Sequence, residues 1–237
     1  MSAISNLILT GYNPATSATA QPIWGVTGTQ YIQLTTGTAL EAVSSSANDA
    51  AAGTGARTIR VEGVDANYVP FAETVTLDGA TPVALANTSV IAVNNAYVLT
   101  AGSGLTNAGN VDIRAVTGSL IKRRIQAVVE SRGEASDFVY TMPASRYGLM
   151  KRIQVYCVTS TGSVWVYLKF QSSTGLERVK FTASTSLDVT AFSNGKIDID
   201  FGNGLYVPEK TLVTLIVDMT AGTPLVSAVG QLEIHAS

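Results

Sequence analysis

The amino-acid sequence predicts an all-β protein with two consecutive antiparallel β-sandwich or jelly-roll-like domains after a short N-terminal arm. Apolar and polar residues alternate with a period of two in many short runs, as in strands with one buried and one solvated face. Gly, Asn and Asp separate these runs at modest spacing, which is typical of an antiparallel sandwich or barrel. No heptad pattern or βαβ rhythm occurs in the sequence. We therefore divide the chain into an arm (residues 1–24), an N-terminal β-sandwich domain (25–118) and a C-terminal jelly-roll-like domain (119–237).

The clearest element is a β-hairpin formed by residues 58–64 and 73–77. In its first run Ile59 and Val61 alternate with charged residues. Residues 65–67, Asp-Ala-Asn, supply the turn, because Asp and Asn side chains hydrogen-bond to their own backbone. The hairpin carries no reactive side-chain pattern, so it indicates architecture and no activity.

The rest of the first domain is predicted to consist of short strands and polar loops. Residues 29–43 indicate a strand, a turn at Gly37 and a second strand. Residues 44–57 are small and contain no apolar anchor, so we expect an exposed and mobile loop there. Further strands are expected at residues 82–85, 89–93, 97–100 and 111–115, with a second Gly- and Asn-rich loop at residues 101–110.

Residues 120–130 contain the basic cluster Lys122, Arg123 and Arg124. The apolar positions of this run fit either a helix or one face of a strand, and the surrounding β pattern favours a strand. The three cations would either meet an acidic neighbour or lie in a solvated turn. We favour the solvated turn.

The second domain is expected to hold about eight antiparallel strands, the size of one jelly roll. Pro143 ends the first of them, because proline cannot donate to a strand ladder. The strand at 163–170 has apolar or aromatic residues on both faces, so we expect it to be central or covered on its second side. The predicted strands lie at residues 139–142, 149–158, 163–170, 178–182, 196–201, 211–219 and 231–235.

Composition limits the classes of function. Only 14% of the residues are charged, against about a quarter in an average soluble protein. A surface with few charges loses little hydration energy on contact with other protein. The net charge of −2 argues against nucleic acid as a partner, since nucleic-acid binding needs a basic surface. No apolar run has the length of a membrane span, and no basic residue precedes the short apolar run near the start, so we expect neither a membrane partner nor a secretory signal.

Few residues offer catalytic chemistry. Asp198 and Asp200 share one face of a strand and could act in glycoside hydrolysis or hold calcium, but their alternating apolar neighbours mark them as the wet face of an amphipathic strand. His235 is the sole histidine and lies at a terminus that we expect to fray. Cys157 is the sole cysteine and is in phase with apolar residues, so we expect a small buried hydrophobe. We predict no catalytic, cofactor-binding or metal-binding residue.

The N-terminal arm, residues 1–24, contains apolar residues in an otherwise small and polar segment. Such residues need a partner, either a neighbouring subunit or the parent domain through an added edge strand. We favour the neighbouring subunit. The predicted interaction residues are Leu7, Ile8, Leu9, Tyr12 and Trp24.

Residues 44–103, from SSSANDAAAGTGARTIRVEGVDANY to NNAYVLTAGS, are followed by AGNVDIRA at residues 108–115. Together they resemble a segment of virion structural proteins of tailed bacteriophages. The similarity continues through the strand that ends at Pro143 to the YVPEKT run, and it covers about residues 44–220 in order. This resemblance implies a β-rich accessory component of the particle, such as a capsid cement protein or a part of a tail or head fibre. It supplies no catalytic residues.

We therefore predict a non-enzymatic virion protein, made in the host cytoplasm and placed on the capsid surface. It would be a capsid cement (decoration) protein that binds the major capsid protein. We expect a homotrimer, because shell lattices offer threefold positions. The alternative is a tail or head-fibre module that binds a host-surface glycan through exposed aromatic residues, for which the candidates are Trp24, Tyr147, Trp165, Tyr167 and Tyr206. A third possibility is a glycan-cleaving enzyme that uses Asp198 and Asp200.

Overall fold

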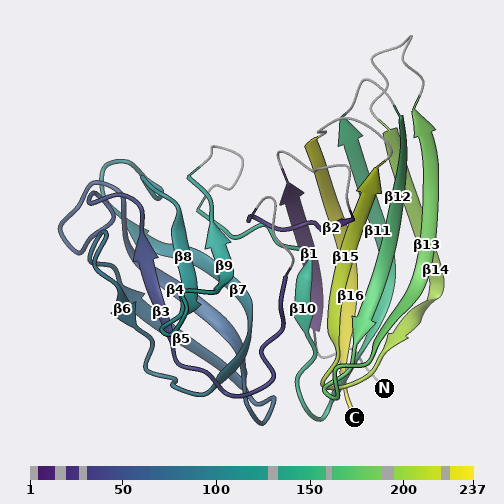
Figure 1. Ribbon diagram of the computed structural model, residues 1–237, viewed down its shortest axis with the longest axis horizontal. Helices are drawn as coiled ribbons and strands as arrows, with labels where there is room; N and C mark the ends of the chain where they lie inside the picture. Colours follow the sequence, from purple (N-terminus) through teal and green to yellow (C-terminus); the bar gives the residue numbers. More distant parts are fainter. Residues whose placement is uncertain are drawn as a thin grey trace. The chain divides into compact units, whose positions relative to one another are not determined.

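The computed structural model describes residues 5–13, 20–26, 31–127, 133–158, 162–187, 195–219 and 225–237. These residues form sixteen strands, β1 to β16, and no helix, which confirms the all-β prediction (Figure 1). The chain divides into two compact units. Unit 1 comprises Met1–Tyr31 and Asp137–Ser237, and unit 2 comprises Ile32–Ser136.

These units differ from the expected domains at 25–118 and 119–237. Strand β8 (Val111–Ala115) pairs with β9 (Ile121–Ile125), so the expected boundary at Gly118 lies in a turn inside one sheet. At the other end of the chain, β1 (Ser5–Asn13) pairs antiparallel with β16 (Leu225–Ala236) along all nine of its residues. Unit 1 therefore contains both ends of the sequence, and unit 2 interrupts it.

Unit 1 is built from two antiparallel sheets that share one core. The first sheet has the strand order β1-β16-β11-β14, and the second has the order β10-β15-β12-β13, with β2 paired to β15. The remaining bounds in this unit are β2 Gln21–Pro22, β10 Val139–Thr141, β11 Arg146–Val158, β12 Gly162–Gln171, β13 Glu177–Leu187, β14 Gly195–Val207 and β15 Leu212–Met219. The strands predicted from alternation all occur, most of them a few residues longer than expected.

The core of unit 1 follows from the period of two. On β11 the inward residues Ile153 and Val155 are fully buried, as are Val164 and Val166 on β12. Each such aliphatic side chain stabilises the fold by about 1.5–3 kcal/mol through burial. Phe138 is fully buried against the backbone at Gly230, where a Cβ atom would approach the Phe138 ring to 2.4 Å. A side chain at position 230 would therefore displace the fully buried Phe138 ring.

Unit 2 also consists of two antiparallel sheets around one core. Their strand orders are β6-β3-β8-β9 and β5-β4-β7. The bounds not yet given are β3 Leu40–Ser44, β4 Ala56–Asp65, β5 Pro70–Thr76, β6 Val83–Ala84 and β7 Val90–Ala101. Pairing of β4 with β5 confirms the predicted hairpin. At its turn the Asp65 carboxylate accepts hydrogen bonds from the backbone N–H groups of Asn67 (2.8 Å) and Val69 (2.9 Å), as the Asp-Ala-Asn sequence suggested.

Two expectations in unit 2 are wrong. The separate strands expected at residues 89–93 and 97–100 are one strand, β7, whose register against β4 shifts at several points. These irregularities break the alternation that a sequence pattern detects. The described part of residues 29–36 contains no strand, and β3 begins only at Leu40.

Candidate functional site

The structure places most of the five predicted interaction residues inside unit 1. Leu9 is 5% exposed and Trp24 is 2% exposed, and Leu7 and Tyr12 are half-buried. Ile8 alone of the five is well exposed, at 55%. Because β1 is a regular strand of the chain's own sheet, its alternate residues face the core. The own-sheet edge strand, which the sequence analysis placed second, is what the structure shows, while residues 1–4 and 14–19 of the arm lie outside the described residues.

Ile8 belongs to an exposed surface, the outward side of the sheet β1-β16-β11-β14, which we call the four-strand face. Strand register sets its side chains in rows, such as Thr10, Val229, Gln154 and Asp198 on four successive strands. Its exposed large apolar residues are Ile8, Tyr156, Tyr206 and Val229, and its charged residues are Lys151, Arg152, Lys196, Asp198, Asp200 and Glu233.

The charged groups at the centre of this face bind one another. Asp198 accepts two hydrogen bonds from Arg152, of 2.8 and 2.5 Å, and one from the Gln154 amide, of 2.9 Å. The Lys196 ammonium group lies 3.0 Å from the same carboxylate and 5.6 Å from the centre of the Tyr156 ring. The hydrogen bonds, that from Arg152 foremost, hold the pKa of Asp198 well below its usual value.

Asp200 has a separate, local role. Its carboxylate accepts a hydrogen bond of 2.7 Å from the backbone N–H of Gly202, which adopts a left-handed conformation with φ of 57°. Each carboxylate therefore has its own local partners on the outward side of β14, which supports the interpretation of both as the wet face of a strand. In the part of the chain that the structure describes, no group of three or more His, Cys, Asp or Glu residues could hold a metal ion.

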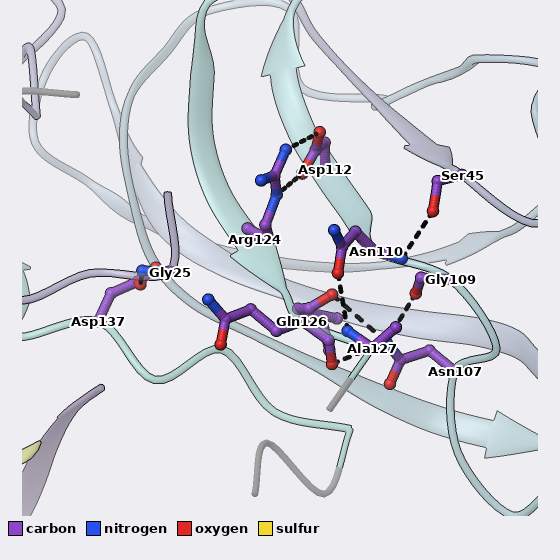
Figure 2. Close-up of polar contacts among 11 residues, drawn as sticks. Gly25, Ser45, Asn107, Gly109, Asn110, Asp112, Arg124, Gln126, Ala127 and Asp137 are labelled. Atoms are coloured by element: carbon purple, nitrogen blue, oxygen red, sulfur yellow. Dashed lines mark hydrogen bonds and ion pairs between the residues drawn. The ribbon is translucent and has the colours of Figure 1, made fainter. Parts of the chain in front are cut away.

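The basic cluster does not lie in a solvated turn, and one of its three cations, Arg124, meets an acidic neighbour. Lys122 and Arg123 are buried in β9 of unit 2, at 1% and 2% exposure. Lys122 donates to the carbonyl oxygen of Ile32, and Arg123 donates to that of Asn94. Arg124 forms a bidentate pair with Asp112 at 2.6 and 2.8 Å (Figure 2). All three cations therefore serve the fold of unit 2. Burial lowers the pKa of Lys122 to about 8. Residues 128–130 of the run lie outside the described residues.

His235 does not lie on a frayed end. Strand β16 is paired on both sides, and His235 is 7% exposed. Its ring stacks on that of Tyr147, with the ring centroids 5.0 Å apart. The centroids of the Tyr147 and Tyr206 rings are 5.6 Å apart. Cys157 is 1% exposed, and burial raises the pKa of its thiol to about 11, which confirms the prediction of a small buried hydrophobe.

Asp49, a residue for which we predicted no role, is fully buried in unit 2. Its carboxylate oxygens accept four hydrogen bonds of 2.6 to 2.9 Å, from Ser44 Oγ and from the backbone N–H groups of Ala56, Ala108 and Gly109. Residues 44–57 are therefore anchored by a polar centre, and the expectation of a loose loop without an anchor is wrong. The signal available in the sequence was a lone Asp followed by small residues and Gly55. In the structure a Cβ atom added at Gly55 would lie 2.1 Å from an Asp49 oxygen, so only glycine leaves room for this carboxylate.

Two asparagines complete this loop end. The buried Asn107 side chain donates to the carbonyl oxygens of Gly109 (2.8 Å) and Gln126 (3.1 Å). Asn110 accepts from the N–H of Ala127 at 2.8 Å and donates its own N–H to the Ser45 hydroxyl at 2.9 Å. Figure 2 shows these contacts joining the loop of residues 101–110 to its surroundings. Polar side chains thus replace an apolar core at this end of the unit.

No family model matches the chain, and no curated protein matches it. Among solved structures, the infectious bursal disease virus Gt strain aligns with 98% of this chain and 72% of its own, at 10% identity and a TM-score of 0.25. The STIV MCP aligns with 96% of this chain and 97% of its own, at 13% identity and a TM-score of 0.25. TM-scores of this size do not establish a shared fold. Among the described residues no helix is long and apolar enough to cross a membrane.

Proposed function

We propose that this chain is a non-enzymatic structural protein of a tailed-bacteriophage particle. Specifically, we propose a capsid cement protein that binds the major capsid protein over the assembled shell and self-associates as a trimer. The sequence resemblance over about residues 44–220 supports the virion assignment. The roles of Asp198 and Asp200 in local contacts of the fold favour a structural protein over a glycan-cleaving enzyme.

The observation that carries this proposal is the composition of the four-strand face. It exposes Ile8 by 55%, Tyr206 by 56%, Val229 by 38% and Tyr156 by 37% on one side of one sheet. Between them, Asp198 is already paired with Arg152 and Lys196. A docking protein would cover apolar surface without separating these charges from their partners, so the desolvation cost of contact is small.

The mechanism is mass action. A subunit that binds only the assembled shell stabilises that state, by about 2.7 kcal/mol per site when its free concentration is 100 times Kd. No bond chemistry is needed. A β-surface whose charges are paired with one another suits this task, since it presents little net charge to a partner and its affinity should depend little on ionic strength.

Co-sedimentation with purified heads tests the proposal. We expect the wild-type chain to pellet with expanded, DNA-free heads that lack tails, and Val229→Lys to lose most of this retention, because it places an unpaired cation in the contact. Thr76→Lys, an exposed change on β5 of unit 2, is the matched control and should be retained. Binding to tails alone, with no retention on heads, would refute the cement assignment.

Attachment to host cells, measured beside co-sedimentation with heads, separates the glycan-binding alternative from the cement proposal. That reading is favoured by Tyr206, which is 56% exposed beside Tyr147, and by Trp165, which is 40% exposed on the outward side of β12. Exposed aromatic rings of this kind stack on sugars. If the wild-type chain is not retained on heads but attaches to host cells, and Tyr206→Ala abolishes that attachment, the chain is a glycan-binding module.

A further inference from the structure

Asn203 lies between two glycines, Gly202 and Gly204, where the pairing of β14 with β11 is interrupted. Four residues of β14, 201–204, stand opposite the single residue Lys151 of β11. Both glycines have left-handed backbones, with φ of 57° and 101°. Asn203 itself is exposed, and within the described part of the chain no hydrogen bond holds its side-chain amide. This side chain can therefore turn toward its own backbone.

An asparagine followed by glycine is chemically labile, because its side chain can react with the next backbone nitrogen. Here the amide nitrogen of Gly204 would attack Cγ of Asn203 and form a new C–N bond that closes a cyclic imide. The Cγ–Nδ2 bond breaks, and the proton lost by the Gly204 N–H passes through solvent to the departing ammonia. Water then opens the imide at either carbonyl carbon, which leaves aspartate or isoaspartate at position 203. Water is the only co-reactant.

The fold requires glycine at position 204. A Cβ atom there would lie 2.8 Å from the Leu149 Cβ and 3.3 Å from the Lys151 Cδ. The φ of 101° is also strained for every residue except glycine. The nitrogen that must attack therefore has no side chain beside it to shield it, and the local backbone geometry preserves the reactive pair.

Lys151 contacts the peptide group that must react. Its ammonium group donates a hydrogen bond of 3.1 Å to the carbonyl oxygen of Asn203, and this oxygen belongs to the same peptide group as the Gly204 nitrogen. The Lys151 side chain is only 25% exposed, and its ammonium group also lies 3.4 Å from the Glu233 carboxylate. A cation on the carbonyl oxygen stabilises the anion that remains when the Gly204 nitrogen loses its proton. The contact therefore increases the population of the attacking form.

We propose that Asn203 is a self-modification site, where the contact from Lys151 promotes conversion of the asparagine to aspartate or isoaspartate by the backbone nitrogen of Gly204. The product carries a new carboxylate on the residue that Lys151 contacts, beside the four-strand face. It adds one negative charge to a chain whose net charge is −2. The inference does not depend on the proposed function, because the reaction needs only the folded chain and water.

The test is peptide mapping by mass spectrometry of the folded chain, incubated at mildly alkaline pH. We expect the peptide that contains residue 203 to gain the mass of the amide-to-acid exchange, with isoaspartate and aspartate both present. Lys151→Met should slow this conversion by about threefold or more, because the peptide anion loses its neighbouring cation. Lys151→Arg keeps a cationic donor and should stay within about twofold of wild type.

A second Asn-Gly pair, at residues 194–195, is the reference within the same molecule. Asn194 lies outside the described residues. Its conversion is read from the same digests and should proceed at one rate in all three proteins. Asn203→Gln should show no conversion at position 203, because the longer side chain would have to close a larger ring.

Two results would overturn the inference: folded wild type that keeps its asparagine at position 203, or equal rates there in wild type and Lys151→Met. In urea the contact from Lys151 is lost, so both proteins should then convert residue 203 at the same rate. A difference that persists in urea would also overturn it, because the effect would not come from the fold. If Lys151→Met fails to fold, Lys151→Gln replaces it, since glutamine keeps a hydrogen-bond donor without the charge, and it should show the same slowing.

Discussion

Lys122 is a cation placed in the interior of unit 2, with its ammonium group held by the Ile32 carbonyl oxygen. Burial disfavours the charged form and lowers its pKa from 10.5 to about 8. The folded chain therefore releases this proton at a lower pH than the unfolded chain does. By linkage, stability rises with pH wherever the unfolded state binds more protons, which here is the range from about 8 to about 10.5. Asp49, the other buried polar centre of unit 2, has a carboxylate group that accepts four hydrogen bonds.

We predict that the free energy of unfolding in urea gains about 1 kcal/mol from Lys122 between pH 7 and pH 9. Cys157 acts in the opposite direction, because its raised pKa makes the folded state lose stability as the pH passes the value of the unfolded thiol. The difference in the free energy of unfolding between wild type and Lys122→Met isolates the contribution of the lysine, since both proteins retain Cys157. A difference that does not change with pH over this range would contradict the assignment.

At the scale of elements, β1 shows what a sequence pattern leaves out. The apolar alternation of residues 7–9 identified a strand-like segment, but its partner β16 lies more than 200 residues further along the chain. Pairing at that distance leaves no local trace. The same holds for β9, whose cations were expected in water. Two of them, Lys122 and Arg123, instead contact backbone oxygens supplied by residues 32 and 94. Local strands were predictable, whereas long-range partners and buried polar anchors were not.

Adjacent residues of β1 give a matched test of this strand. Leu9→Ala removes a side chain from the core of unit 1 and should lower the free energy of unfolding by about 2–5 kcal/mol. Ile8→Ala changes an exposed position of the same strand and should change the free energy of unfolding by no more than about 0.5 kcal/mol. Chemical denaturation measures both. Equal small effects would mean that β1 is the loose arm that the sequence first suggested.

At the scale of the whole molecule, the two units have separate cores. The core of unit 1 includes Leu9 of β1 and Leu232 of β16, strands near opposite ends of the sequence. The buried residues of the unit 2 core lie between Leu40 and Ala135, with the partly buried Leu34 packed against them. This is why the sequence order suggested two consecutive domains and the structure shows one unit interrupted by another. The expected loop at residues 101–110 is present, but its attachment to Asp49 through the N–H groups of Ala108 and Gly109 was revealed by no local pattern.

We predict that residues 32–136, expressed alone, fold cooperatively, because every strand pair of unit 2 is contained in this range. The isolated unit should show a single thermal transition and dispersed amide resonances. Residues 137–237 alone lack β1 and β2 and should be less stable than unit 1 in the full chain. An unfolded 32–136 fragment beside a folded full chain would show that unit 2 depends on the rest of the molecule.

The pairing of β1 with β16 has a consequence for synthesis. A nascent chain carries β1 out of the ribosome long before its partner β16, which begins at Leu225. Unit 2 has all its strands much earlier and can fold while translation continues. During that interval the backbone edge of β1 is unpaired and the Leu9 side chain is uncovered. When many copies are translated close together, β1 of one nascent chain can therefore pair with β1 of another.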